Sequence, residues 1–327
     1  MRTHNEPRNR VERAERGNLY QEVTDRIVAD LEQGKVPWAQ PWGTAQAGLG
    51  LPKNANSGRH YSGINILILW GAVIEKGFQG QNWLTFKQSL DLGGCVRKGE
   101  RGTTVYYADR FIPKGEHERA AKDGDEPGAV SFLKRFTVFN VDQCDGLPES
   151  AQAAAAPMPE CEAIPHAERL IAGTGADFRI GGDRACYRKD DDFIQVPPQP
   201  AFFHQIDYYR TCFHELGHWT GHTKRLARDF SGRFGSHPYA REELVAEMTS
   251  AFICASLNII PTVRHADYLG SWLEVLREDN RAIFRAASQA GKAADFILAF
   301  QKQAEPTAAA AIASEPFAAE SATRAAA

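Results

Sequence analysis

Apolar residues recur at helical spacing along much of the chain. Between residues 18 and 34, Leu19, Val23 and Ile27 recur at intervals of four, and Gly34 follows as a stop signal. This pattern predicts an amphipathic helix. Similar patterns predict further helices over residues 64–77, 85–94, 166–176, 204–222, 239–257 and 266–302, the last broken near Gly291.

Runs rich in β-branched and aromatic residues predict strands in both halves of the chain. Residues 103–112 and 132–141 are predicted to pair, with the polar segment 114–128 as a solvated hairpin loop between them. Three short predicted strands, at residues 177–182, 185–189 and 192–197, precede the helices of the second half. Mixed strands and helices of this kind favour an α+β fold for each half.

A segment rich in alanine and proline, residues 148–165, divides the chain and is typical of a linker. It separates a predicted N-terminal α+β domain, residues 18–147, from a predicted C-terminal domain, residues 166–303. We expect residues 1–17 to form a flexible charged arm and residues 304–327 a disordered tail.

Composition narrows the class of protein. The net charge of −3 gives no indication of a nucleic-acid partner. Any affinity for DNA must therefore come from basic residues clustered locally on the surface. No apolar run approaches the roughly 18–20 residues that cross a bilayer, and the polar N-terminus lacks the apolar middle of a signal peptide. The six cysteines include no CxxC pair, as expected of reduced thiols. We therefore expect a cytoplasmic protein with no membrane partner.

The stretch HELGH, residues 214–218, predicts a metal site. His214 and His218 are four residues apart, so on a helix both imidazoles lie on one face and can converge on one Zn²⁺. Glu215 lies on the adjoining face, where it can accept a proton from water activated by the metal without being a ligand itself.

A third histidine, His222, lies too far along the helix to complete this site. Eight residues from His214 correspond to about 12 Å of straight helix, whereas the ligands of one tetrahedral zinc lie within roughly 3–4 Å of each other. The spacing also misses the HExxHxxGxxH register, in which a turn brings a later histidine back. We expect His222 to lie at the C-terminal end of the helix, where the macrodipole favours it.

A glutamate from the next predicted helix is a better third ligand. The segment YAREELVAEM places Glu243 and Glu247 four residues apart. We predict Glu243 as the ligand and Glu247 as the partner that supports His214 or His218, although the sequence leaves the choice between the two glutamates open. The alternative is that Glu242, Glu243 and Glu247 form a solvated helix face. Three protein ligands leave the fourth position of the metal open, as catalytic zinc sites do.

Two further features fit a peptidase site. The segment YRKDDDFIQVP resembles the edge strand onto which an extended peptide adds by β-pairing. Tyr239 and Tyr268 are candidates to stabilise an oxyanion, although each on its own is more simply interpreted as a core or surface aromatic.

Aromatic and basic residues are interleaved in the N-terminal half, as in platforms for single-stranded nucleic acid. The alternative is that the tryptophans fill a core while the charges are solvated. The candidate DNA-binding residues are Trp38, Trp42, Tyr61, Trp83, Arg97, Lys98, Arg101 and Lys134.

Most of residues 18–302 resembles the ArdC-type antirestriction proteins of conjugative plasmids, whose N-terminal domain is shared with TraC-type plasmid primases. The motifs that carry the resemblance are WLTFKQSLDLGGCVRKGERGTTVYY, FTVFNVDQCDGL, YYRTCFHELGHWTGHTKRL, YAREELVAEM and YLGSWLEVLREDNRAIFRAASQA. The resemblance implies an N-terminal single-stranded-DNA-binding domain and a C-terminal zincin-like metallopeptidase domain. By motif, the zinc ligands carry over to His214, His218 and Glu243, and the catalytic residue to Glu215.

The sequence therefore predicts an antirestriction protein that binds single-stranded DNA, carries a zinc peptidase site and protects incoming plasmid DNA during conjugation. Its protein substrate would be a host restriction protein or a DNA-bound protein. Two alternatives are a DNA-binding shield whose zinc is structural, and a regulatory protease that cleaves a DNA-bound protein. A general base such as Glu215 favours an enzyme, because a structural zinc site needs none.

Overall fold

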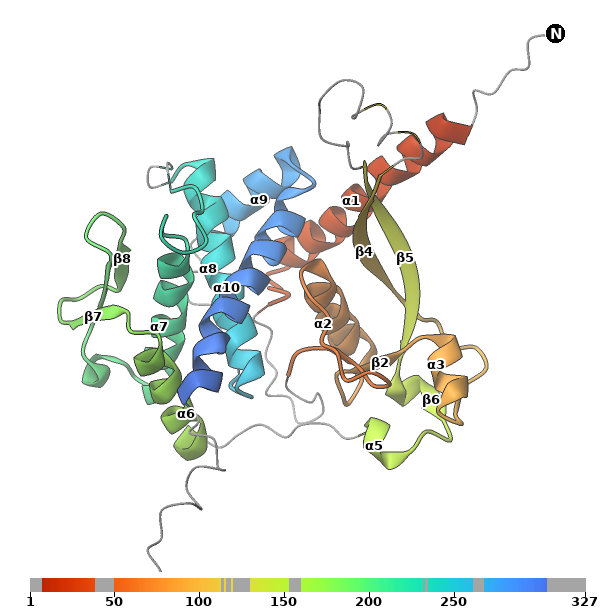
Figure 1. Cartoon of the computed structure of the whole chain (residues 1–327), viewed down its shortest axis with the longest axis horizontal. Coiled ribbons are helices and arrows are strands. Elements are labelled where there is room, and N and C mark those ends of the chain that lie inside the picture. The colour runs from red at the N-terminus through yellow and green to blue at the C-terminus, as the bar shows by residue number, and fades with distance from the viewer. Residues whose placement is uncertain are drawn as a thin grey trace, which may run out of the picture.

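The computed structural model describes residues 8–38, 50–112, 130–152, 160–230, 235–260 and 268–304, together with the isolated positions 115, 119 and 232. Figure 1 shows a group of helices on one side of the molecule, a sheet on the other, and helix α2 between them. The fold is α+β, as predicted.

The N-terminal half is built around a four-stranded sheet in the order β1-β2-β5-β4. Strands β4 and β5 form its long antiparallel pair, in which Thr103 lies opposite Val138. A two-stranded sheet of β3 and β6 lies beside it. The elements are α1 (Arg8–Glu32), β1 (Lys53–Asn54), α2 (Ile64–Lys76), β2 (Asn82–Leu84), α3 (Phe86–Asp91), β3 (Cys95–Val96), β4 (Thr103–Phe111), β5 (Val130–Asn140), β6 (Cys144–Asp145) and α5 (Glu149–Gln152).

The C-terminal half packs a bundle of helices against a small sheet in the order β7-β9-β8. Strand β9 runs parallel to β7 and antiparallel to β8, which leaves β8 at an edge. The elements are α6 (Glu160–Gly173), β7 (Asp177–Ile180), β8 (Cys186–Arg188), β9 (Phe193–Val196), α7 (Gln205–Thr220), α8 (His237–Ser256), α9 (Leu269–Glu278) and α10 (Ala282–Ala304).

Two predicted boundaries differ from the observed ones. Helix α1 begins at Arg8, so the predicted flexible arm is helical from that residue onward. The break in the last predicted helix falls at Asp279, where the backbone is extended and the carboxylate accepts a hydrogen bond from the Arg281 amide. Gly291 lies inside α10 instead, where an added Cβ would stand 3.9 Å from the backbone of Gly63. An alanine would fit at this position in ordinary van der Waals contact, so close packing does not require the glycine.

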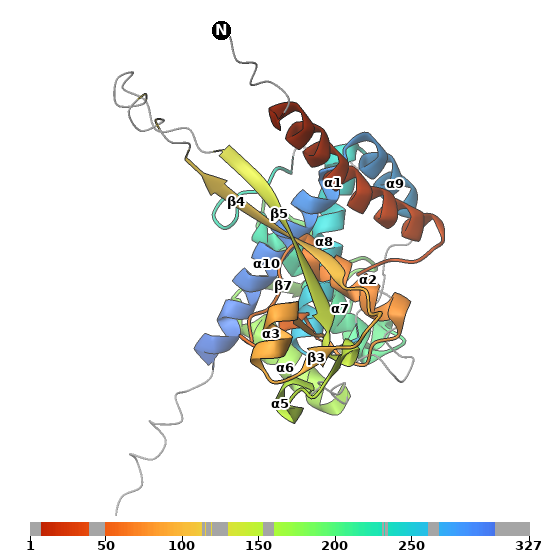
Figure 2. The same ribbon diagram turned by 90° about the vertical axis from the view of Figure 1, so that its right-hand side faces the viewer.

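The two halves share one hydrophobic core. Trp38 packs edge-on against Trp272, and Trp70 packs edge-on against Phe252, with ring centroids 5.6 and 5.7 Å apart. Helix α1 lies along α9 in both views (Figures 1 and 2), and the Thr24 hydroxyl donates to the Asn280 carbonyl there. The predicted linker, residues 148–165, contains α5 and the start of α6, while residues 153–159 lie outside the described part of the chain.

Within the described residues, no helix is both long enough and apolar enough to cross a membrane.

Candidate active site

Helices α7 and α8 carry the candidate metal ligands and touch at Gly217. A Cβ added at Gly217 would stand 3.0 Å from the Cα of Ala246, so any larger residue would push the two helices apart by a few tenths of an ångström. The helices can therefore cross with their backbones nearly in contact. As a result, the polar face of α7 meets the glutamates of α8 deep inside the molecule.

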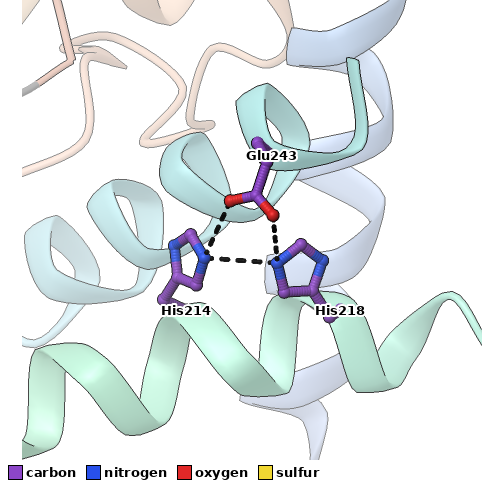
Figure 3. A group of neighbouring side chains, drawn as sticks. All are labelled: His214, His218 and Glu243. Carbon is purple, nitrogen blue, oxygen red and sulfur yellow. Dashed lines mark hydrogen bonds and ion pairs between the residues drawn. The ribbon is translucent and has the colours of Figure 1, made fainter. Parts of the chain in front are cut away.

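Three side chains converge at this crossing (Figure 3). The Nε2 atoms of His214 and His218 lie 3.2 Å apart. Each of these atoms lies 3.5 Å from one oxygen of Glu243. All three residues are buried, and they are the group of potential ligands found within the described residues.

The donor set and its spacing fit a zinc ion. Two imidazoles and one carboxylate are ligands that zinc accepts, each at about 2.0–2.2 Å. In a tetrahedron with such bonds, the ligand atoms lie about 3.3 Å from each other. The observed separations of 3.2 and 3.5 Å match that geometry. A carboxylate that binds through both oxygens, or a larger divalent ion, would require only small movements of these three side chains.

Opposite charges offset the cost of burial among the ligand side chains. Burial opposes a charge on His218, but the carboxylates of Glu243 and Glu242 raise its pKa to about 9. Burial likewise opposes a charge on Glu243, yet His218 and His214 lower its pKa to about 2. The positive charge of protonated His218 therefore offsets the charge of the neighbouring carboxylates, as a bound cation would.

Both histidines have a second carboxylate behind them. The Nδ1 atom of His218 lies 3.2 Å from Glu242, and that of His214 lies 3.6 Å from Glu247. Such outer carboxylates orient the ring and make the coordinating nitrogen more basic. Glu242, Glu243 and Glu247 are all buried, so the alternative of a solvated helix face is wrong.

Arg228 fixes the orientation of Glu242. Its Nε and Nη2 atoms donate to the two carboxylate oxygens at 3.0 and 2.7 Å. The same guanidinium donates to the carbonyl of Gly217 and to the hydroxyl of Thr220 at the end of α7. The role of Glu242 was not predicted, because spacing alone does not distinguish the three glutamates of α8. Arg228 was not predicted, because no local sequence pattern connects it to Glu242.

The ligands face a cavity of about 590 Å³. Glu215 lines this cavity and is 5% exposed, so the predicted general base lies beside the predicted metal. Edge strand β8 forms another wall. The segment predicted as the edge strand, residues 187–197, contributes only its first two residues to β8, and most of the rest forms a turn and the central strand β9. A peptide that paired with β8 would thus pass the metal.

The two tyrosines singled out from the sequence meet in the same cavity. The hydroxyls of Tyr239 and Tyr268 lie 3.1 Å apart, and Tyr239 also hydrogen-bonds to Glu243. Both residues are partly buried. Both hydroxyls therefore lie beside the ligand group.

His222 lies beyond the C-terminal end of α7, outside the ligand group. Its Nδ1 atom is 3.9 Å from a carboxylate oxygen of Asp192. Asp192 in turn pairs with Arg225, and Tyr187 of β8 donates to it at 2.8 Å. These contacts tie the end of α7 to strand β8.

The predicted DNA-stacking role is contradicted for two of the tryptophans. Trp38 and Trp83 are both 0% exposed and pack against Trp272 and Phe78. Neither ring offers a face to a base, so the alternative of a core role holds for both. Trp42 lies outside the described residues.

The remaining candidates for DNA contact are accessible to different degrees. Tyr61 is half-buried. Arg97 is exposed but already pairs with Glu100 and Asp145. The last three candidates, Lys98, Arg101 and Lys134, are exposed on the surface of the N-terminal half.

Family comparisons match the two halves separately. The family described as the N-terminal domain of anti-restriction factor ArdC matches residues 17–139. The family described as zincin-like metallopeptidase matches residues 165–289.

Similar proteins match most of the chain. The protein y4eC of Sinorhizobium fredii is 41% identical, over 88% of this chain and 94% of its own length. DNA primase TraC of Escherichia coli is 38% identical over 87% of this chain, which spans only 27% of the primase. The metal-free crystal structure of the antirestriction ArdC protein from plasmid R388 is 40% identical, with a TM-score of 0.72, over 87% of this chain and 98% of that one. Its Mn(II)-bound structure is 40% identical, with a TM-score of 0.71, over 86% and 98%.

The C-terminal half is thus a zincin-like metallopeptidase domain with a buried His-His-Glu metal-binding group. The chain as a whole belongs to the ArdC family of antirestriction proteins.

Proposed function

We propose that this antirestriction protein binds single-stranded DNA and hydrolyses peptide bonds with zinc, and that it protects incoming plasmid DNA during conjugation. It would act in the cytoplasm on a host restriction protein or a DNA-bound protein. The observation that carries the peptidase part is the buried Glu215 carboxylate in a cavity shared with three converging ligand atoms.

In this proposal His214, His218 and Glu243 hold the metal, while Glu242 and Glu247 orient the two rings. When bound, zinc supplies Lewis-acid chemistry, which polarises a peptide carbonyl and makes water a stronger acid. Glu215 accepts the proton of the attacking water and delivers it to the leaving nitrogen. The hydroxyls of Tyr239 and Tyr268 donate to the oxyanion.

The DNA-binding part is supported by the N-terminal family match and by the similarity to a DNA primase. Exposed cations of the N-terminal half, Lys98, Arg101 and Lys134, supply charge for phosphates. Arg97 is a candidate that must exchange its present partners for a phosphate.

Two assays on the full-length protein test this function. We expect zinc-dependent cleavage of an unfolded protein substrate, and binding of a labelled single-stranded oligonucleotide that weakens as salt rises. Binding without any cleavage would favour a DNA-binding shield with a structural metal. Cleavage without binding would leave a peptidase whose N-terminal half does something else.

A further inference from the structure

A second cavity, of about 720 Å³, lies between the two halves of the protein, away from the metal. One wall comes from residues 50–62 and the start of β2, and the opposite wall comes from the end of α8 and the outer half of α10. We call it the α10 cavity. Its volume falls within the roughly 300–1,000 Å³ typical of small-molecule sites.

One wall of the α10 cavity carries basic side chains that have no acidic partner within the described part of the chain. Lys53 and His60 face each other across a β-bridge and both line the cavity, and exposed Arg59 is next in sequence. No carboxylate of the described residues pairs with these three side chains. Unpaired cations on one loop are suited to a phosphate.

The loop that presents these groups is held in shape. The side-chain oxygen of Asn54 accepts hydrogen bonds from the amides of Asn56 and Ser57, which closes a tight turn. Asn54 also hydrogen-bonds to Tyr61, which is partly buried against the core and lines the cavity. An aromatic ring held beside a loop that carries basic side chains resembles a stacking site for a base.

The interior offers groups that can recognise the edge of a base. Gln81, Asn82 and Asn258 line the cavity together with apolar residues that include Phe252. The Asn82 side-chain amide already donates to the Ala151 carbonyl. Asp295 of α10 also lines the cavity and is exposed to solvent, and partial desolvation raises the pKa of its carboxyl group. Within the described residues it has no ion pair or hydrogen bond. Amide and carboxyl groups around an aromatic ring match the donors and acceptors of a nucleobase.

We propose that the α10 cavity binds one nucleotide of a single DNA strand, with its base beside Tyr61 and its phosphate at Lys53, Arg59 and His60. This inference rests on the proposed binding of single-stranded DNA. It places the strand at the junction of the two halves instead of on the N-terminal half alone. Trp38 and Trp83 are buried, so neither ring competes with Tyr61 as a stacking site.

The test compares two 15-nucleotide strands bound to the full-length protein, one with adenine bases and one made only of abasic residues. We expect Tyr61→Ala to weaken binding of the adenine strand about tenfold, because a stacked ring is lost, and to leave binding of the abasic strand unchanged. Tyr61→Phe keeps the ring and should bind both strands within about twofold of the parent. Tyr107→Ala is the matched control, since Tyr107 is an exposed aromatic outside the cavity.

The outcomes separate this inference from the proposed function. If the parent protein binds neither strand, the DNA-binding function fails and the cavity proposal fails with it. If the parent binds and Tyr61→Ala binds equally well, or weakens both strands equally, only the cavity proposal is overturned. A further experiment measures whether deoxyadenosine monophosphate competes with the adenine strand for the protein. Weak competition that depends on Tyr61 supports a site for a strand, whereas binding tighter than that of the strand would assign the cavity to a free nucleotide.

Discussion

At the scale of residues, the site is organised around three glutamates on one face of α8 that have different tasks. Glu243 points between the two histidines, whereas Glu242 and Glu247 each approach one ring from behind. Their difference in role arises from the crossing of α7 over α8, since all three are similarly buried. We therefore expect the three positions to respond differently to substitution.

Glu243→Ala should lose the metal, because two imidazoles alone bind zinc weakly. Glu247→Ala should still bind about one equivalent, with affinity lowered roughly 10- to 100-fold by the loss of an outer partner. Metal analysis and competition with a chelator measure both effects. His222→Ala is the control and should match the parent. Equal metal loss in the Glu247 and Glu243 variants would contradict the assignment of Glu243.

The stability of the metal-free protein should depend on pH through His218 and Glu243. The pKa of His218 is raised from 6.5 to about 9, so its stabilising contribution is complete below pH 6.5 and is lost as pH rises through 9. The pKa of Glu243 is lowered from 4.5 to about 2, so its contribution is present above pH 4.5 and is lost as pH falls toward 2.

Thermal unfolding of the chelator-treated protein should therefore show a lower Tm at pH 9 than at pH 6.5. Saturating zinc should raise the Tm more at pH 9, because the metal no longer competes with a proton. A zinc-induced increase in Tm that is larger at pH 6.5 would contradict this account of the site.

At the scale of elements, the close crossing of α7 and α8 positions the ligands. Gly217→Ala places a methyl group 3.0 Å from the Cα of Ala246, so the helices must separate. We expect it to destabilise the protein by about 1–3 kcal/mol and to weaken metal binding. Gly270→Ala is the matched control, since Gly270 is also helical but has nothing within 4 Å. That change should be neutral or stabilising by up to about 1 kcal/mol. Denaturant unfolding with and without zinc measures both.

The helices of the site were predictable because their sequence patterns are local. Periodic apolar residues and HExxH spacing place α7 and α8 within a few residues of their observed ends. The break before α10 was misplaced because a single glycine is tolerated inside a helix, whereas no strong helix breaker marks Asp279, where the backbone becomes extended. Arg228 and the burial of Trp38 and Trp83 depend on distant contacts that no local pattern encodes.

At the scale of the whole molecule, the shared core implies that the two halves depend on each other for stability. Trp38 from the N-terminal half is fully buried against Trp272 of α9. We expect Trp38→Ala to cost about 3–5 kcal/mol and to lower the unfolding transition of the whole protein. Far-ultraviolet circular dichroism and zinc release, followed on heating, should change together. Two separate transitions would show that the halves unfold independently.

The central claim is that the metal centre is a peptidase site with Glu215 as its base. Glu215→Gln keeps the size of the side chain but removes the carboxylate that accepts a proton, and Glu215 is not among the ligand group. The most direct measurement is peptide hydrolysis by this variant alongside its zinc content. The account predicts one zinc per chain and a loss of activity of about 10²–10⁴-fold. Hydrolysis at the parent rate with zinc still bound would contradict it.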